Sequence, residues 1–351
     1  MPRQNKLKER LDIGTVFCAE GYLFQMEHRG YLKAGAYVPE VALDNPDALY
    51  QLHRDFARCG TDVQLAFTYY AHREKLKAVG RENELEKINR AALKIAREVA
   101  EETDALFAGN ICNTGVFDPD NAEETGKEVK RQYEEQIEWA VDEGVDFIVA
   151  ETIEYLGEAL IALESIKKIG LPAVINFTST NGDETKDDHT WADVCKKLEE
   201  AGADVVGLNC GRGPAAMIPV LKEIKKAVSI PIAALPVAYR TTPEQPGFQS
   251  LTQPNGESAF TLGLEHHLCT RQEMADFAKE AEEIGVEFIG ICCGGEPYHV
   301  RAMVEALGRT VPASKYSPDM SQHYQFGSKE YAKEHEQKNL DYVKVRPNLN
   351  Q

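Results

Sequence analysis

Three cysteines at two places in the chain carry the chemistry that this sequence offers most clearly. Cys210 ends the apolar run VVGLNC, and the vicinal pair Cys292 and Cys293 ends the run FIGICC. Three thiolates form a soft ligand set that suits zinc, and a catalytic zinc site typically keeps a fourth position for water or substrate. The sequence therefore indicates a metal site with one open position.

The backbone around the vicinal pair must bend if both sulfurs are to reach one ion. Adjacent residues of a regular strand point to opposite faces, so Cys292 and Cys293 can share a metal only where the strand has ended. Gly294 and Gly295 follow at once and permit that bend. On these residues alone, three other roles stay open: a closed structural zinc with His299 as fourth ligand, a redox pair, and unrelated buried thiols.

The elements that must position these cysteines form a repeating pattern. Short apolar runs rich in β-branched residues alternate with longer amphipathic stretches, as in parallel strands joined by crossover helices. Eight runs occur, near residues 15, 63, 105, 147, 173, 205, 232 and 288. The prediction is an α/β fold, a (β/α)8 TIM barrel over residues 1–309, with a C-terminal extension.

Two segments depart from this rhythm. A stretch rich in Pro, Gly, Thr and Gln runs from Tyr239 to about Leu262, too long for a plain connector, and is expected to be a lid or an oligomer contact. Residues 310–351 are polar and offer little core. We expect them to form an arm that lies across the barrel or contacts a neighbouring subunit of a homo-oligomer.

Composition limits the partners and the compartment. The 351 residues include 57 acidic and 39 basic side chains, a formal charge of −18, which opposes binding to nucleic acid and to anionic membranes. No apolar run is long enough to span a membrane, and the basic start leads into no apolar signal core. We expect a cytoplasmic protein with reduced thiols, of which Cys59 and Cys195 are buried in helices.

Barrel enzymes build their sites at the carboxyl ends of the strands. The polar residues expected at those ends include Glu20, Tyr70, Glu151 and Asn209, in addition to the three cysteines. The neighbouring residues Phe67 and Tyr69 are assigned to the core.

Several motifs, taken in order, resemble the homocysteine S-methyltransferase family, and its betaine–homocysteine branch most closely. GLNC is followed by GICCGGEPYHVRAM, with Cys292 placed 82 positions after Cys210. RGYLKAGAYVPE, LHRDFARCGTDVQLAFTYYA, FIVAETIE and GLEHHLCTR also look like that branch. The similarity runs over most of the chain.

The resemblance implies a barrel whose three cysteines, Cys210, Cys292 and Cys293, bind Zn2+. The thiol of homocysteine would take the fourth position, where the metal keeps it anionic at neutral pH. The methyl donor would be an onium compound such as glycine betaine or dimethylsulfoniopropionate, and methionine would be the product. Glu151 matches the carboxylate that receives the amino group of the acceptor.

The resemblance also implies roles around this centre. Tyr37 and Tyr70 look like the donor-binding aromatics, Glu265 like a further carboxylate at the mouth, and Gly294 opens a turn whose N–H groups could face a substrate carboxylate. The predicted substrate-binding residues are Glu20, Gly21, Tyr37, Tyr70, Asn209, Glu265 and Gly294.

Two departures leave both substrates open. The family usually carries Asp-Gly-Gly after the first strand, whereas this chain reads Ala19-Glu20-Gly21, so Glu20 would have to recover the missing carboxylate. Tyr37 stands where the betaine branch commonly has tryptophan. The alternatives are methyl transfer to another thiol or to a separate corrinoid protein, and a thiol-based redox or metal-sensing barrel.

Overall fold

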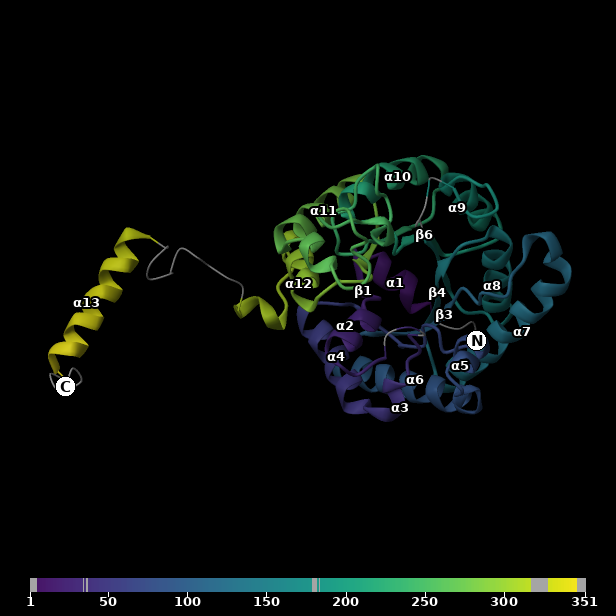
Figure 1. Ribbon diagram of the computed structural model, residues 1–351, viewed down its shortest axis with the longest axis horizontal. Coiled ribbons are helices and arrows are strands. Elements are labelled where there is room, and N and C mark those ends of the chain that lie inside the picture. The colour runs from purple at the N-terminus through teal and green to yellow at the C-terminus, as the bar shows by residue number, and fades with distance from the viewer. Residues whose placement is uncertain are drawn as a thin grey trace. The chain divides into compact units, whose positions relative to one another are not determined.

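The computed structural model describes residues 5–316 and 328–345, apart from 34, 36, 179–181 and 183. Eight parallel strands form one sheet in the order β1-β8-β7-β6-β5-β4-β3-β2. Helices follow the strands along the chain and surround them (Figure 1). The predicted α/β TIM barrel is confirmed, and each of the eight expected runs contains a strand.

The strands are short and fully buried. They are β1 (Val16–Ala19), β2 (Val63–Leu65), β3 (Leu106–Cys112), β4 (Phe147–Ile153), β5 (Ala173–Thr178), β6 (Val205–Asn209), β7 (Ile232–Leu235) and β8 (Phe288–Ile291). Burial on both faces explains why they read as continuous apolar runs rather than as alternating ones.

The long helices that cross between strands are amphipathic and turn their apolar side to the sheet. The helices before β4 are α1 (Lys6–Leu11), α2 (Tyr22–His28), α3 (Val41–Asp44), α4 (Pro46–Cys59), α5 (Arg73–Ala78), α6 (Leu85–Thr103) and α7 (Ala122–Glu143). Those of the barrel after β4 are α8 (Leu156–Lys168), α9 (Trp191–Glu200), α10 (Pro214–Ala227), α11 (Arg271–Ile284) and α12 (Pro297–Ala306). A further helix, α13 (Lys329–Val345), lies near the end of the chain.

Glycines at helix ends explain the recurring phrase of helix, glycine and short strand. Gly144 ends α7 and Gly285 ends α11 in the left-handed conformation, with φ of 87° and 90°. Glycine adopts this conformation without a steric cost, so the chain can reverse into the next strand within two or three residues.

One buried carboxylate joins the first strand to the second. The backbone N–H of Asp62 donates to the carbonyl of Phe17 at 2.8 Å, and Phe17 N–H donates to Asp62 Oδ2 at 2.8 Å. Arg10 and Arg309 both donate to the same carboxylate at 2.8–2.9 Å. Asp62 is therefore paired twice, which offsets the cost of burying its charge.

The chain divides into two compact units, Met1–Pro312 and Ala313–Gln351. The first contains the barrel, and the described part of the second contains α13. Both the expected boundary after residue 309 and the oligomer contact of the arm stay predictions. No helix among the described residues is long and apolar enough to cross a membrane.

Cys59 and Cys195 are buried in α4 and α9, as expected.

His53 of α4 is also fully buried. Its Nδ1 lies 3.1 Å from Gln64 Oε1 and 3.2 Å from the hydroxyl of Tyr22. Burial lowers the pKa of His53 to about 4, so the ring is neutral in the folded protein at neutral pH.

We predict that His53 makes the protein less stable in acid. An unfolded histidine titrates near pH 6.5, so between about pH 6.5 and pH 4 the unfolded state binds a proton that the native state excludes. This difference lowers the free energy of unfolding by about 3 kcal/mol over that range. Between pH 7 and pH 4, the free energy of unfolding measured with urea should fall less for His53→Gln than for wild type. His28→Gln, at an exposed position, is the control, and parallel wild-type and His53→Gln curves would contradict the prediction.

Candidate metal and substrate site

The three cysteines named from the sequence meet at the carboxyl end of the barrel. The sulfur atoms of Cys210, Cys292 and Cys293 all lie within 4.8 Å of one another, and those of Cys210 and Cys293 are 3.7 Å apart. Two sulfurs bound to one tetrahedral zinc at about 2.3 Å would be about 3.8 Å apart. The spacing and the soft donor set therefore fit a metal ion of this kind.

The chain beyond β7 holds both cysteine turns. Cys210 N–H donates to the carbonyl of Leu235, and Cys292 N–H donates to the carbonyl of Pro236, at 2.9 and 2.8 Å. The next link runs from Ala238 N–H to the carbonyl of Cys293, at 3.0 Å. Three backbone hydrogen bonds along residues 235–238 thus set the distance between the two cysteine turns.

Left-handed backbone occurs where the cysteine turns need it. Cys210 has a φ of 57°, which is uncommon for a residue with a side chain and costs of order 1 kcal/mol. Gly294 has a φ of 73°, and a Cβ there would overlap the ring of Tyr239. The bend expected after the vicinal pair is present, and only glycine fits it.

The three thiols are close enough to share hydrogen bonds. Hydrogen bonds from Cys292 and then Cys293 lower the pKa of Cys210 well below its usual value, and contacts with Cys210 and then Cys293 raise the pKa of Cys292. A divalent cation would stabilise all three as thiolates.

Two carboxyl groups lie beside the cysteines, joined by one amide. Asn209 Nδ2 donates to Glu20 Oε2 at 2.9 Å and to Glu151 Oε2 at 3.0 Å, and Asn110 Nδ2 donates to Glu151 Oε1. Burial and then the charge of Glu151 raise the pKa of Glu20 well above its usual range, and burial raises that of Glu151 to about 8. At neutral pH the pair thus carries less than its full two charges.

A bulge in β4 aims Glu151 at this cluster. The register between β4 and β5 shifts between Ala150 and Ile153, and Thr152 there has a φ of 59°. Asn209 Oδ1 accepts from Thr152 N–H at 2.8 Å, so the amide that joins the carboxyl groups also holds the bulge. Sequence reasoning placed Asn110 at a strand end without giving it a role, and it missed Thr152, because nothing in FIVAETIE marks a bulge.

The aromatic residues form a row that begins at Tyr37. The ring of Tyr37 lies 6.2 Å from that of Phe24, which lies 6.0 Å from Phe248; Phe248 stacks on Tyr239 at 5.7 Å. Burial raises the pKa of Tyr37, with smaller contributions from the charges of Glu27 and Cys293. Tyr37 is therefore within electrostatic range of the cysteines, and the 239–262 segment supplies Phe248 to the row.

The second predicted aromatic, Tyr70, is already engaged. Its ring lies 4.1 Å from that of Tyr69, and Lys75 Nζ lies 3.9 Å from the ring centre. An internal cation therefore contacts Tyr70, and Tyr37 is the more open of the two rings. Phe67 is buried as expected, whereas Tyr69 is partly exposed at the mouth rather than fully in the core.

The remaining predicted residues have different surroundings. Glu265 is exposed in a short 3-10 helix (Leu264–His267), and Gly21 lies so close to the cysteine turn that a Cβ would come within 2.9 Å of the Cys292 carbonyl. His299 contacts backbone at both ring nitrogens, the carbonyl of Cys269 and the N–H of Glu296, which leaves neither for a metal.

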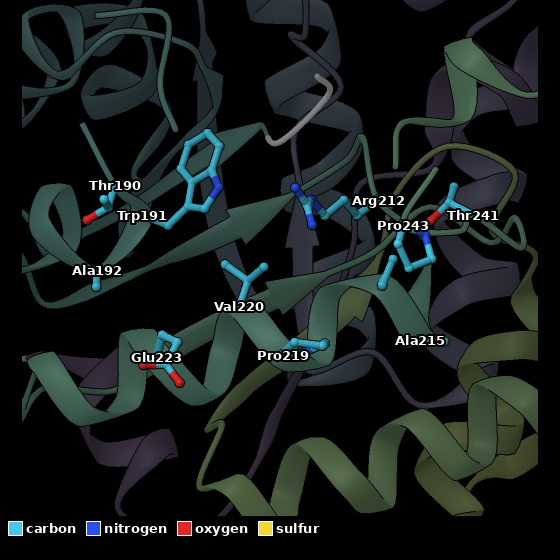
Figure 2. Close-up of a pocket in the computed structure, with 11 residues that line it drawn as sticks. Thr190, Trp191, Ala192, Arg212, Ala215, Pro219, Val220, Glu223, Thr241 and Pro243 are labelled. Atoms are coloured by element: carbon cyan, nitrogen blue, oxygen red, sulfur yellow. The ribbon is translucent and has the colours of Figure 1, made fainter. Parts of the chain in front are cut away.

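A cavity of about 690 Å3 lies elsewhere, between the start of α9 and the side of α10 (Figure 2). Trp191, Pro219 and Val220 line it together with Arg212, whose N–H donates to the carbonyl of Cys210 at 2.8 Å. None of the predicted site residues lines this cavity. It was not expected from the sequence, since its lining has no motif.

Comparisons with known proteins show the family to which the chain belongs. The profile of the homocysteine S-methyltransferase family matches residues 21–307. Betaine–homocysteine S-methyltransferase 1 of Bos taurus is 38% identical over 313 residues, covering 85% of this chain and 74% of that protein. S-methylmethionine–homocysteine S-methyltransferase of Pongo abelii is 35% identical over 330 residues, covering 91% of this chain and 85% of that protein.

A solved structure supports the fold. The homocysteine methyltransferase MmuM from Escherichia coli, in its metallated form, superposes with a TM-score of 0.67 at 19% identity, covering 85% of this chain and 99% of MmuM. The family profile spans nearly the whole barrel, including all three cysteines. The chain belongs to the homocysteine S-methyltransferase family.

Proposed function

We propose that this protein is a zinc-dependent S-methyltransferase that moves a methyl group from an onium donor to homocysteine and so forms methionine. The observation that carries the proposal is the convergence of Cys210, Cys292 and Cys293, with sulfurs spaced as one tetrahedral ion would require. The donor class includes glycine betaine and dimethylsulfoniopropionate. The protein is further predicted to be cytoplasmic and homo-oligomeric.

Cys210, Cys292 and Cys293 would hold the ion. When bound, zinc supplies Lewis acidity that keeps an acceptor thiol anionic at neutral pH. The ordered turns around the three cysteines hold the ligand set ready before substrate arrives, which reduces the ordering that binding must accomplish.

The carboxyl pair suits the amino group of an amino-acid thiol. Glu151 lies deep in the mouth, and its two oxygens are held by Asn110 and Asn209. An ammonium placed there would favour the ionised form of Glu151, whose pKa burial raises in the free protein. Glu20 provides a second carboxyl beside it, and the Gly294 turn would offer N–H groups to the α-carboxylate.

The methyl donor would approach past Tyr37. An onium group has no N–H to donate, so aromatic faces and nearby negative charge recognise it. Thiolates and carboxylates at the mouth add that negative charge. In the methyl transfer the carbon–onium bond breaks as the carbon–sulfur bond forms, and the donor leaves with the bonding electron pair as a neutral amine or sulfide.

The alternative function, a thiol-based redox or metal-sensing protein, would use the cysteines but gives the aromatic row and the carboxyl pair no role.

We predict that Cys210→Ala removes both bound zinc and methyl transfer, because the ion loses one of the three thiolates that make the site selective for a soft metal. Zinc per chain would be measured by atomic emission, and methyl transfer from glycine betaine to homocysteine by product analysis. Cys195→Ala, at a buried cysteine of α9, should keep its zinc. Full activity in a metal-free Cys210→Ala protein would refute the mechanism.

Replacing Tyr37 by alanine should weaken donor binding selectively. Loss of one cation–π contact of about 0.5–2 kcal/mol would raise the KM for the onium donor about 2- to 30-fold, with little change in the KM for homocysteine. Tyr37→Phe should retain most of the affinity. Tyr316→Ala, at an exposed tyrosine, is the control, and equal losses for donor and acceptor would remove Tyr37 from the donor site.

Glu151→Gln should act on the acceptor side. Loss of a charged hydrogen bond to the ammonium costs about 1.5–3 kcal/mol, so the KM for homocysteine should rise about 10- to 150-fold. A thiol without an amino group, such as 3-mercaptopropionate, should react equally well with Glu151→Gln and wild type. If the variant instead discriminated equally against both thiols, Glu151 would have no role in ammonium binding.

A further inference from the structure

Glu20 has a carboxyl oxygen without a hydrogen bond, although the residue is buried. Oε2 accepts from Asn209, whereas Oε1 has no partner among the residues that the structure describes. Only 7% of the residue surface is exposed. A buried carboxyl oxygen that lacks a partner is costly, so this atom calls for a cation or a donor that is part of the working protein.

The other members of the cluster limit what that partner can be. A carboxylate oxygen of Glu20, one of Glu151 and the sulfur of Cys292 lie within 4.8 Å of one another. Cys292 belongs both to this group and to the three-cysteine group, so the two sets of ligand atoms meet at one sulfur. Glu151 accepts a hydrogen bond at each of its oxygens, which leaves Glu20 as the member of the pair with an open oxygen.

We propose that the Glu20 carboxylate supplies the fourth ligand of the metal before an acceptor thiol binds. This inference rests on the zinc site of the proposed function. A carboxylate oxygen at about 2.0–2.2 Å from zinc would lie about 3.5 Å from a sulfur ligand in a tetrahedral site. The present spacing of a Glu20 oxygen and the sulfur of Cys292, within 4.8 Å, exceeds that distance by little more than 1 Å at most.

The position that Glu20 would fill is the one that a thiol acceptor needs. Glu20 and the acceptor therefore compete for it. Once displaced from the metal, the Glu20 carboxylate would lie beside Glu151, at the place expected for the ammonium group of the acceptor. An amino-acid thiol would meet both requirements at once, whereas a simple thiol would displace Glu20 without giving the released carboxylate a partner. The departure from Asp-Gly-Gly to Ala19-Glu20-Gly21 would then change the resting ligand of the metal as well as a substrate contact.

Zinc affinity without substrate tests the inference. Competition with a chelator should show that Glu20→Gln binds zinc about tenfold or more weakly than wild type, because the amide that replaces the carboxylate is a neutral, poorer ligand. The control is Glu143→Gln, which should bind zinc like wild type. Glu143 lies on α7, and its buried carboxylate pairs with Arg97 of α6. Equal zinc affinity in wild type and Glu20→Gln would overturn the inference.

A second measurement asks whether water is bound to the metal. In the Co2+-substituted wild-type protein, electron paramagnetic resonance lines should show no broadening in oxygen-17 water, since the fourth ligand is a carboxylate, and should broaden once Glu20→Gln admits water. Broadening in wild type would overturn the inference by placing water on the metal. If neither protein binds zinc or cobalt, the proposed function fails; if both bind and only the Glu20 dependence is absent, the inference alone fails.

Discussion

The mouth of this barrel concentrates groups that become negative. Three cysteine sulfurs lie within 4.8 Å of one another, and that of Cys292 lies within 4.8 Å of a carboxylate oxygen of Glu20 and one of Glu151, so their mutual repulsion and their desolvation must be offset by protons or cations. Burial and then the charge of Glu151 raise the pKa of Glu20, and contacts with Cys210 and then Cys293 raise that of Cys292. In the working enzyme, a divalent ion, an ammonium and an onium group would take over the task.

Asn209 is the residue that makes this crowding possible. Its two amide protons face three acceptors, an oxygen from each carboxyl group and the hydroxyl of Thr152, all at 2.9–3.0 Å. Its oxygen accepts from the β4 bulge, and the next residue is Cys210. The end of β6 thus positions the carboxyl pair, through Asn209, and the Cys210 sulfur at adjacent residues of the chain.

Sequence reasoning predicted the parts of the site that depend on spacing along strands. Eight apolar runs placed the strand ends, and the barrel brings strand ends together, so the meeting of Cys210 with Cys292 and Cys293 could be expected. The roles of Thr152 and Phe248, and the pairing of Asn110 with Glu151, could not be predicted, because a bulge, a loop aromatic and a contact between two strands arise only through tertiary structure. The same holds for Lys75 on the ring of Tyr70, which no local pattern predicts.

The buried carboxylate of Asp62 strengthens one end of the barrel. It ties β1 to β2 with Arg10 and Arg309 at the amino end of the strands, away from the cysteines. Cohesion at that end leaves the opposite end able to tolerate strained backbone at Tyr37, Tyr70, Thr152 and Cys210. Evolution can therefore exchange residues at the mouth, as Ala19-Glu20-Gly21 illustrates, and acquire new donors or acceptors while the barrel itself stays folded.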